Sequence, residues 1–426
     1  MEIQELYNYF LQCSALSTDT RKIEPGSLFV ALKGDTFDAN SFALEALSKG
    51  AKYVVIDNPE YKSDDRMLLV NNSLEALQQL ANYHRRQLGL PVIALTGSNG
   101  KTTTKELINA VLSKKYTTKA TVGNLNNHIG VPLTLLSFTA ATEIGIVEMG
   151  ANHQKEIGFL CSIAEPNFGY ITNFGKAHLE GFGGYEGVIK GKSELYHHLE
   201  QNTKMAFVNL DDAIQNEKTA KLPRFTFAVE NYNCDVRIEG ITGNEMVTIL
   251  YNGMEIRSNL IGTYNAANIS AAIAIGVYFK VSDAKIKSAI EGYVPSNNRS
   301  QLIEKNGCRI ILDAYNANPS SMAAAIANFR QMEGEKVAIL GDMFELGAES
   351  PDEHRKIAAL LADRDDIETF FVGKDFYANS VEKSHLHFFE SYDDLKNHFP
   401  PTGLKNKTIL IKGSRGMALE RVLELL

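Results

Sequence analysis

A glycine-rich loop with one lysine and four threonines is the strongest chemical signal in the sequence. It reads TGSNGKTTT, residues 96–104, and stands between the apolar run VIALT and a stretch with helical periodicity. Glycines let successive backbone N–H groups point at one anion, and the helix N-terminus adds its positive dipole end. In such a loop Lys101 meets the β- and γ-phosphates of a nucleotide, and the Thr102 hydroxyl holds Mg²⁺. The alternative is a Gly/Asn-rich turn with an exposed lysine, which the flanking strand and helix disfavour. The residues expected to touch ATP here are Gly97, Ser98, Asn99, Gly100, Lys101, Thr102 and Thr103.

The loop is a shortened variant of the general phosphate-binding pattern. That pattern has glycine five positions before Gly100, where this chain has Leu95, and Gly97 is only three positions before it. The variant therefore points to a particular family rather than to nucleotide hydrolases at large.

A carboxylate follows at the end of a second apolar run, EIGIVEMGAN. Glu148 stands about fifty residues after the loop, where its oxygens could reach the metal of a bound nucleotide. A glutamate at a strand end is often only a solvated or capping residue. The preceding phosphate loop favours the metal ligand.

The elements that must position these residues predict an α/β fold in three domains. Residues 1–89 alternate helices and strands and end in Gly89-Leu90-Pro91, which marks a boundary. The elements expected there are a helix over 1–11, a strand Leu28–Leu32, a helix near 41–49, a strand Tyr53–Ile56 and a helix Ser73–Leu88.

Residues 90–297 are expected to form a central, parallel-sheet ATPase domain of the phosphate-loop type, with an antiparallel appendage. Strands at 92–96, 144–148 and 170–172 and a helix over 185–199 suit a parallel sheet covered by helices. The appendage is indicated by Asn252-Gly253, a strong hairpin signal between TILY and MEIR. In residues 298–426 the strands RIILD, VAILGD, FFVGKD and TILIKGSRG predict a Rossmann-like domain that binds ligands at strand ends.

Composition excludes several classes of protein. The 426 residues suffice for nearly three domains of ~150 residues, and 44% apolar with 22% charged residues is ordinary for globular proteins. The net charge of −8 gives no sign of a nucleic-acid partner. The longest apolar run, Ala271–Phe279, is far short of the ~20 residues of a membrane span, so no membrane insertion is expected. The start lacks the basic region of a signal peptide, and the four cysteines are scattered singly, which together indicate the cytoplasm.

Ten ordered stretches make the chain resemble the Mur ligase family over essentially its whole length, and within that family the branch that adds D-alanyl-D-alanine. The stretches are STDTRKIEPGSLFVALKGDTFDAN, TGSNGKTTTKE, GNLNNHIGVPLTLL, VEMGANHQKEIGFL, AHLEGFGG, GKSELY, GTYNAANISAA, LDAYNANPSSM, GDMFELGAESPDEH and KGSRGM. The resemblance implies an ATP-dependent amide ligase of peptidoglycan precursor synthesis. Its substrates would be UDP-N-acetylmuramoyl-tripeptide (UDP-MurNAc-tripeptide) and D-alanyl-D-alanine (D-Ala-D-Ala), and we expect a monomer.

The resemblance also implies two Mg²⁺ ions. One would be held by Thr102 and Glu148, and the other by His178 and a carbamylated lysine. Lys192, four residues before Tyr196, suits the family's spacing better than Lys190 does. Carbamylation requires a neutral amine, hence a lysine whose charged form is disfavoured. A packed loop histidine and an ordinary surface lysine are the plain alternatives.

Further nucleotide contacts come from the same resemblance. Arg299 matches an arginine that approaches the γ-phosphate, although Asn298 replaces its usual glycine neighbour, and Tyr264 replaces a usual histidine. For Asn318 a helix cap before Pro319 is a serious alternative. The remaining positions matched to ATP are Asn265, Asn268, Tyr315, Asn316, Asn318 and Asp342.

Substrate contacts are expected in all three domains. In the first domain, which the family uses for the UDP-sugar, STDT could equally be a turn and cap, and DAN replaces the family's DGH at 38–40. The first-domain positions are Ser17, Thr18, Asp19, Arg21, Gly34 and Asp35. Asn124, Asn126, Asn127 and His153 would border the peptide, and Lys412, Ser414 and Arg415 would engage the dipeptide carboxylate.

Three other functions compete with this interpretation. A folylpolyglutamate synthase-like ligase is disfavoured by NLNNHIGVP, DAYNANP and the N-terminal domain. A P-loop GTPase or nucleic-acid-stimulated ATPase would need an N-K-x-D motif or a basic stripe, and neither is present. A non-catalytic nucleotide-binding module is expected to lack some of Lys101, Glu148, His178 and Lys192, and all four are present.

Overall fold

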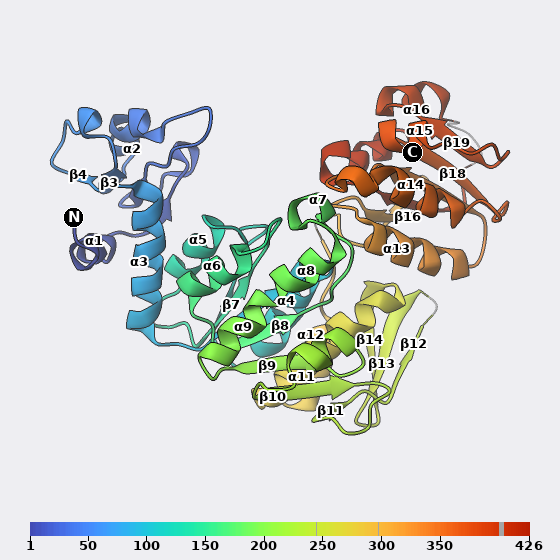
Figure 1. Ribbon diagram of the computed structural model, residues 1–426, viewed down its shortest axis with the longest axis horizontal. Coiled ribbons are helices and arrows are strands. Elements are labelled where there is room, and N and C mark those ends of the chain that lie inside the picture. Colours follow the sequence, from blue (N-terminus) through green and yellow to red (C-terminus); the bar gives the residue numbers. More distant parts are fainter. Residues whose placement is uncertain (244, 297, 400–403) are drawn as a thin grey trace.

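The computed structural model describes residues 1–243, 245–296, 298–399 and 404–426, which form three α/β domains. In Figure 1 the N-terminal and C-terminal domains stand apart above the central domain, so that the molecule has the outline of a V. The predicted three-domain α/β fold is confirmed. The expected boundary between the second and third domains includes residue 297, which lies outside the described residues.

The N-terminal domain is built on a four-stranded parallel sheet of order β1-β2-β3-β4. In β2 the side chains alternate between two cores: Leu28 and Val30 pack toward α1 and α3, and Phe29 packs toward α2. The elements are α1 (Ile3–Phe10), β1 (Leu16–Ser17), β2 (Leu28–Val30), α2 (Ala43–Ser48), β3 (Tyr53–Ile56), β4 (Met67–Leu69) and α3 (Ser73–Leu88).

Helix α3 has the bounds that its sequence predicts, because both ends carry strong signals. The Asn72 side chain accepts a hydrogen bond from the Glu75 N–H at 3.0 Å, and Gly89 closes the helix in the left-handed region at φ 64°. Its apolar stripe packs on α1 and on two helices of the central domain, α5 and α6. Arg85 near its end donates to Ala164 O at 2.9 Å and to Glu165 O at 2.8 Å. The helix therefore joins the N-terminal domain to the central domain through side-chain packing and hydrogen bonds.

The central domain contains a seven-stranded parallel sheet of order β11-β10-β9-β8-β5-β7-β6. All five residues of β5 are buried between β7 and β8, as a continuous apolar run in a parallel sheet requires. Its strands are β5 (Val92–Thr96), β6 (Thr118–Ala120), β7 (Ile144–Glu148), β8 (Phe168–Ile171), β9 (Met205–Asn209), β10 (Arg224–Ala228) and β11 (Val236–Arg237). The carboxyl ends of β5, β7 and β8 thus meet at one edge of the sheet.

The helices of the central domain are α4 (Lys101–Leu112), α5 (Gly130–Leu136), α6 (Glu156–Ala164), α7 (Leu179–Phe182), α8 (Tyr185–Lys192), α9 (Glu194–Gln201), α10 (Ala213–Lys218), α11 (Ala266–Tyr278) and α12 (Asp283–Glu291). The helix expected over 185–199 is interrupted at Ser193. Glu194, directly after the break, accepts hydrogen bonds from the N–H groups of Lys155 at 2.5 Å and Gly158 at 2.8 Å, where α6 begins. The break thus lets one helical segment stabilise the start of another.

The antiparallel appendage is confirmed as a three-stranded sheet of β12 (Gly240–Thr242), β13 (Met246–Tyr251) and β14 (Met254–Ile261). Asn252 and Gly253 both take positive φ values, 49° and 69°, as the tight turn requires. The long apolar run of the sequence lies mostly in α11, which is buried against α4 and this sheet. Among the described residues no helix combines the length and the hydropathy of a membrane span.

The C-terminal domain is a six-stranded sheet of order β15-β16-β20-β17-β18-β19, parallel except for the pair β15–β16. Its elements are β15 (Gln301–Lys305), β16 (Cys308–Asp313), α13 (Pro319–Gln331), β17 (Lys336–Gly341), α14 (Ser350–Ala359), β18 (Ile367–Val372), α15 (Lys374–Ala378), β19 (Leu386–Phe389), α16 (Tyr392–His398) and β20 (Thr408–Lys412). The ends of β16 and β20 face the central domain and carry side chains into the site described next.

Candidate functional site

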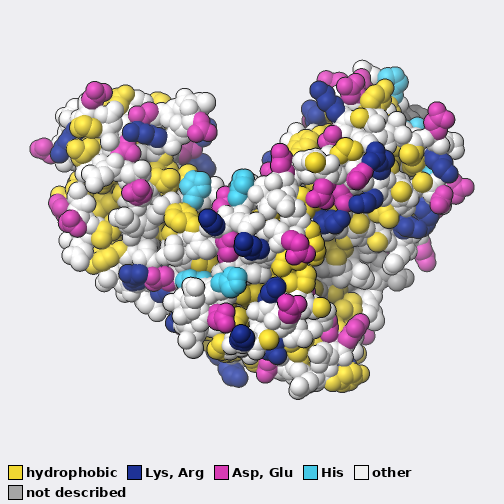
Figure 2. Space-filling view, viewed as in Figure 1, with side chains coloured by type: hydrophobic (Ala, Val, Ile, Leu, Met, Phe, Trp, Pro, Cys, Tyr) yellow, Lys and Arg dark blue, Asp and Glu magenta, His cyan; other side chains and the backbone are white. Residues whose placement is uncertain are grey.

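A cavity of about 1080 Å³ lies where the carboxyl edge of the central sheet meets the C-terminal domain. The space-filling view shows the molecule hollowed between its two upper domains, with Lys, Arg and His side chains on the floor (Figure 2). Most residues that the sequence singles out line this cavity. They are Ser98, Asn99, Gly100, Lys101, Thr102, Thr103, Asn124, Asn126, Asn127, Glu148, His178, Asn265, Asn268, Arg299, Tyr315, Asn316, Asn318 and Lys412.

The glycine loop follows β5 and opens α4, and its two glycines have backbone conformations that other residues rarely adopt. Gly97 has φ 140° and Gly100 has φ 77°. A Cβ atom at Gly97 would stand 2.0 Å from the Thr172 hydroxyl oxygen, and one at Gly100 would stand 2.6 Å from the Asn268 side-chain oxygen. Both positions therefore require glycine, and the loop is packed tightly against its neighbours.

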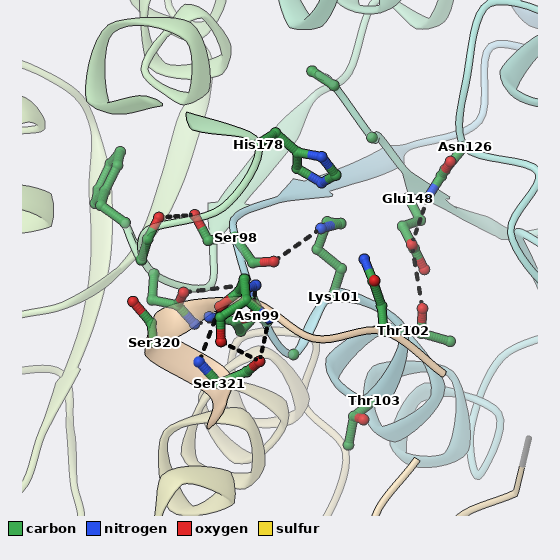
Figure 3. A pocket seen from close by; sticks show the side chains of 18 of the residues that line it. Ser98, Asn99, Lys101, Thr102, Thr103, Asn126, Glu148, His178, Ser320 and Ser321 are labelled. Atoms are coloured by element: carbon green, nitrogen blue, oxygen red, sulfur yellow. Dashed lines mark hydrogen bonds between the residues drawn. The ribbon is translucent and has the colours of Figure 1, made fainter. Parts of the chain in front are cut away.

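Lys101 begins α4, and its ammonium lies beneath the loop. Its Nζ donates to Gly97 O at 2.7 Å and to Ser98 O at 3.3 Å. Burial lowers the pKa of Lys101, an effect that Glu148 opposes and Arg299 reinforces. In Figure 3 the side chain points into the space bounded by His178 and Glu148. A cation that is partly removed from water in this way attracts phosphate more strongly than a fully exposed lysine does.

Glu148 ends β7 with its carboxylate almost fully buried, 1% exposed. Its Oε1 accepts from the Thr102 hydroxyl at 3.3 Å and from Asn126 Nδ2 at 2.8 Å (Figure 3). Its Oε2 has no hydrogen-bond partner within the described part of the chain, and Lys105 Nζ is 3.9 Å away. Mg²⁺ prefers oxygen ligands such as carboxylates and hydroxyls. The buried Glu148 carboxylate, with one oxygen free of hydrogen-bond partners among the described residues, and the neighbouring Thr102 hydroxyl therefore fit the ion.

Two residues, one holding the loop and one beside Glu148, were not predicted from the sequence. Asn173 follows β8 and holds the backbone of Asn99 from both sides: its Oδ1 accepts from the Asn99 N–H at 3.2 Å, and its Nδ2 donates to Asn99 O at 3.0 Å. Lys105, 2% exposed, donates to Thr121 O at 2.7 Å and lies beside Glu148. The strand-end position that drew attention to Glu148 could have found Asn173 as well. No local sequence pattern distinguishes Lys105, because its partners come from other segments of the chain.

Lys192 is buried at the end of α8, 1% exposed, rather than lying on the surface. Among the described residues its Nζ makes one hydrogen bond, to Ala151 O at 3.1 Å, and lies 4.9 Å from the centre of the Phe182 ring. Burial, and then the charge of Lys101, hold the pKa of Lys192 well below its ordinary value. The neutral amine that carbamylation requires is therefore favoured, while Lys190 is exposed.

His178 lies at the start of α7 in the left-handed region, at φ 53°, and its side chain lines the cavity. Its Nδ1 is hydrogen-bonded to Glu345 Oε2, in the loop between β17 and α14 of the C-terminal domain. This hydrogen bond is the main cause that lowers the pKa of Glu345. No local pattern in the sequence marks Glu345, because the contact joins residues 167 positions apart.

Arg299 reaches the cavity from the start of the C-terminal domain. Its guanidinium lies 3.6 Å from the centre of the Tyr315 ring, and its Nε has no hydrogen-bond partner among the described residues. Asn298, which stands where the family has glycine, takes the left-handed conformation at φ 57°. Asparagine tolerates that region better than most residues, so the replacement preserves the turn. Tyr264, the other replacement, donates or accepts a hydrogen bond with the Ser300 hydroxyl at 3.0 Å.

Asn265 and Asn268 are buried against the loop and bonded to each other. Asn268 Nδ2 donates to Asn265 Oδ1 at 2.8 Å, and Asn268 Oδ1 accepts from the Thr104 hydroxyl at 3.0 Å. Asn265 Nδ2 donates to Ile261 O at 2.8 Å. Both line the cavity, and in this structure their side chains support the loop and the start of α4.

Asn318 performs the capping role that the sequence left as an alternative, and makes a second contact. Its Oδ1 accepts from the Ser321 N–H at 2.9 Å at the start of α13, in a reciprocal capping box. Its Nδ2 donates to Asn99 Oδ1 in the phosphate loop at 2.7 Å. The same side chain therefore starts a helix of the C-terminal domain and holds the nucleotide loop of the central domain.

The remaining C-terminal positions are mostly engaged by other protein groups. Lys412, 2% exposed, donates to Asp313 Oδ2 at 2.6 Å. Asp342 accepts from the N–H groups of Asp375 and Phe376 at 3.0 and 2.9 Å, and burial raises its pKa. The other two, Ser414 and Arg415, likewise have partners: the Ser414 hydroxyl accepts from the Phe344 N–H at 2.9 Å, and Arg415 pairs with Glu420 at 3.0 Å. Of these four, only Lys412 lines the cavity.

Of the four expected peptide contacts, Asn124, Asn126 and Asn127 line the cavity and His153 does not. Asn127 Oδ1 accepts from the N–H groups of Ile129 and Gly130, at the start of α5. His153 is exposed beside Glu156, with 3.5 Å between Nδ1 and the carboxylate, and does not line the cavity.

The first-domain positions lie outside the cavity, on the far arm of the V (Figure 1). Asp19 accepts from the Arg21 N–H at 3.0 Å and pairs with its guanidinium at 2.8 Å, which is the turn and cap left open by the sequence. The Arg21 side chain is nevertheless 84% exposed. Gly34 and Asp35 follow β2 in an exposed loop. The structure thus brings most of the nucleotide and metal positions together in one cavity, and it leaves the sugar positions, His153, Asp342, Ser414, Arg415 and the buried Lys192 outside its lining.

The fold and the cavity together define a nucleotide-binding protein of the phosphate-loop type, built from three α/β domains. Family models described as "Mur ligase family, catalytic domain", "Mur ligase middle domain" and "Mur ligase, glutamate ligase domain" match residues 12–85, 95–276 and 298–415. The chain belongs to the Mur ligase family.

Similar proteins span the whole chain. The UDP-N-acetylmuramoyl-tripeptide--D-alanyl-D-alanine ligase of Bacillus subtilis is 35% identical, over 96% of this chain and 92% of that protein. The Escherichia coli ligase of the same name is 36% identical, over 99% of this chain and 95% of that protein. Among solved structures, MurF from Acinetobacter baumannii superposes with a TM-score of 0.87 at 31% identity, over 99% of this chain and 97% of that one. MurF from Thermotoga maritima in complex with ADP gives 0.84 at 26% identity, over 98% and 97%.

Proposed function

We propose that this protein is an ATP-dependent amide ligase that joins D-Ala-D-Ala to UDP-MurNAc-tripeptide in peptidoglycan precursor synthesis. One observation carries the proposal: a partly buried lysine, a buried Thr102–Glu148 pair with a carboxylate oxygen that has no hydrogen-bond partner among the described residues, and an arginine from another domain line a single cavity. The relatives that share the whole chain bear the name of this ligase.

The reaction needs charge stabilisation rather than a protein nucleophile. The tripeptide carboxylate would take the γ-phosphoryl group of ATP, with ADP leaving, and the amine of D-Ala-D-Ala would attack the acyl phosphate. Loss of the amine proton and departure of phosphate then leave the amide bond. Lys101, Arg299 and the loop N–H groups would stabilise negative charge at the phosphoryl group, where it develops.

Two Mg²⁺ ions are part of this proposal, and when bound they would neutralise phosphate charge. Thr102 and Glu148 would hold one ion, and His178 with a carbamylated Lys192 would hold the other. The support lies in the Glu148 oxygen, which has no hydrogen-bond partner in the described ranges of the chain, and in the lowered pKa of the buried Lys192 amine. In this proposal Lys101 and Arg299 would bind phosphate groups, and Thr102, Glu148, His178 and Lys192 would bind metal ions.

We also assign a separate role to each domain. Residues 1–89 would bind the UDP-sugar through Ser17, Thr18, Asp19, Arg21, Gly34 and Asp35; residues 90–297 would bind ATP and the metal ions; and residues 298–426 would bind the dipeptide and the ribose. In this assignment Asp342, Ser414 and Arg415 would have to exchange their present partners for ligand groups. We further propose a cytoplasmic monomer.

Phosphate release from ATP tests the proposed function. We expect release with UDP-MurNAc-tripeptide to depend on D-Ala-D-Ala, and the pentapeptide product to form in equal amount. Lys101→Met should abolish release, whereas Lys114→Met, an exposed lysine just beyond the other end of α4, should not change it. Release that ignores the dipeptide would show that the acceptor is wrong.

A further inference from the structure

The loop between β17 and α14 docks on α7 at two points. Glu345 O accepts a hydrogen bond from the Glu180 N–H at 3.2 Å, and Glu345 Oε2 is hydrogen-bonded to His178 Nδ1. Gly347 packs closely beside them, since a Cβ atom there would stand 3.2 Å from Glu180 Cβ. One loop of the C-terminal domain therefore contacts both the backbone and a cavity-lining side chain of the central domain.

The partner of Nδ1 fixes which ring nitrogen of His178 carries the proton. A carboxylate only accepts hydrogen bonds, so Nδ1 must donate, and in the neutral ring the lone pair then resides on Nε2. Histidines that bind metals commonly donate their other ring N–H to a carboxylate, which sets the tautomer and the orientation of the ring.

We propose that Glu345 is a positioning residue that presents His178 Nε2 to the cavity, so that the second metal position is completed only when the C-terminal domain is docked. The inference rests on the proposed function, in which His178 holds that ion. It adds a residue from a different domain, and with it a link between domain position and metal binding.

If the hydrogen bond between Glu345 and His178 served only to hold the two domains together, it would be redundant, because other contacts already join them. Lys176 Nζ pairs with Glu353 at 2.8 Å, and the Lys176 N–H donates to the Ser320 hydroxyl at 2.8 Å. In addition, His178 and Glu345 both occupy the left-handed region, at φ 53° and 63°. Such conformations are unfavourable for residues other than glycine and persist where the surroundings impose them, often at functional sites.

Manganese binding, measured by electron paramagnetic resonance with a non-hydrolysable ATP analogue, tests the proposal. We expect the wild-type protein to bind two Mn²⁺ ions and His178→Asn to lose the second. Glu345→Ala should weaken the second ion by roughly 10- to 100-fold, the usual effect of removing such a partner. Glu345→Gln should weaken it less, because the amide oxygen still accepts from Nδ1. Glu349→Gln, the same charge change at an exposed position four residues on, should leave both ions unchanged.

Three outcomes would overturn the proposal: wild-type affinity for the second ion in Glu345→Ala, equal losses in Glu345→Ala and Glu349→Gln, or a second ion that survives His178→Asn. Thermal melting of each variant identifies unfolding, and Glu345→Gln gives the answer if Glu345→Ala unfolds. The titration contains neither tripeptide nor dipeptide. A protein that binds two ions as expected but does not ligate would therefore contradict the proposed function and leave this inference standing.

Discussion

Several charged side chains in and around the site are almost fully buried, which is unusual for charged groups. Lys105, Glu148 and Lys192 are each no more than 2% exposed, and burial lowers the pKa of Lys101 and Lys192. Isolated buried charges are costly, so each must be paired, neutralised or matched by a ligand. Lys105 lies beside Glu148, whereas Lys101 and Lys192 are the residues for which we propose phosphate binding and carbamylation.

Replacing Lys192 tests whether this lysine is carbamylated, as we propose. Lys192→Ala should lower kcat by a factor on the order of 10²–10³, as removal of a preorganised electrostatic group does. Short carboxylic acids such as acetate should restore part of the activity, because they fill the space of the lost carbamate. Lys190→Ala, an exposed lysine on the same helix, should stay active in a coupled ADP assay. Full activity of Lys192→Ala would exclude Lys192 as a metal ligand.

At the scale of helices and strands, the sequence predicted best where local signals were strong. Helix α3 and strands β5 and β7 have the predicted bounds, because a cap, a closing glycine or a wholly apolar run marks them. The break at Ser193 was not predicted, because 185–199 is helical in pattern. Directly after the break, Glu194 accepts hydrogen bonds from backbone N–H groups at the start of α6, a contact that no local pattern indicates. Tertiary contacts decided what local propensity could not.

Two substitutions of Asn318 separate its capping role from its contact with the phosphate loop. Asn318→Ala should destabilise the protein by about 1 kcal/mol, since it removes the cap of α13. Asn318→Ser should retain most of that stability, because serine also caps helices, but its side chain is too short to reach Asn99. We expect both variants to raise the KM for ATP to the same extent in steady-state assays. If Asn318→Ser keeps the wild-type KM, the residue serves only as a cap.

The junction between α3 and the central domain should be sensitive to acid. His84 is buried there; its Nε2 donates to Phe138 O at 2.9 Å, and Tyr7 OH is 3.2 Å from Nδ1. Burial lowers the pKa of His84, although the hydrogen bond to Phe138 opposes the shift. As pH falls below the unfolded value of about 6.5, the unfolded chain therefore binds a proton that the folded chain does not, and stability is lost until the folded pKa is reached.

Thermal melting between pH 7.5 and 5 checks this expectation. His84→Gln keeps a donor for Phe138 O and cannot titrate, so its Tm should fall less on acidification than that of the wild type. His197→Gln, at an exposed histidine on α9, should follow the wild type. Parallel curves for wild type and His84→Gln would show that His84 does not control the acid response.

For the whole molecule, the net charge of −8 contrasts with the two highly anionic substrates that we propose. Cations must be concentrated locally, and Figure 2 shows basic side chains on the floor of the hollow between the outer domains. The sequence identified Lys101 and Arg299 as candidate site residues. It could not predict that they line the same cavity, or that His178 contacts Glu345. These residues lie far apart in the chain, and only the docking of the domains brings them together.

Domain closure is the prediction that belongs to this scale. The matched sugar positions lie on one arm of the V and the cavity lies against the other, so a substrate that spans both should draw the arms together (Figure 1). Small-angle X-ray scattering should show a smaller radius of gyration with UDP-MurNAc-tripeptide and an ATP analogue than with the analogue alone. An unchanged scattering profile would show that the domains do not close.

The position of Arg299 has a consequence for the order of events during turnover. The arginine stands between Asn298 and Ser300, both in the left-handed region at φ 57° and 47°, and it stacks on Tyr315 of its own domain. Its guanidinium must therefore travel with the C-terminal domain. If Lys101 and Arg299 act as proposed, the loop and Lys101 would hold a nucleotide while that domain is away, but the phosphoryl group would then lack one of its cations. Nucleotide capture and nucleotide cleavage would become separable, and ATP bound to the open protein would be protected from wasteful hydrolysis by water.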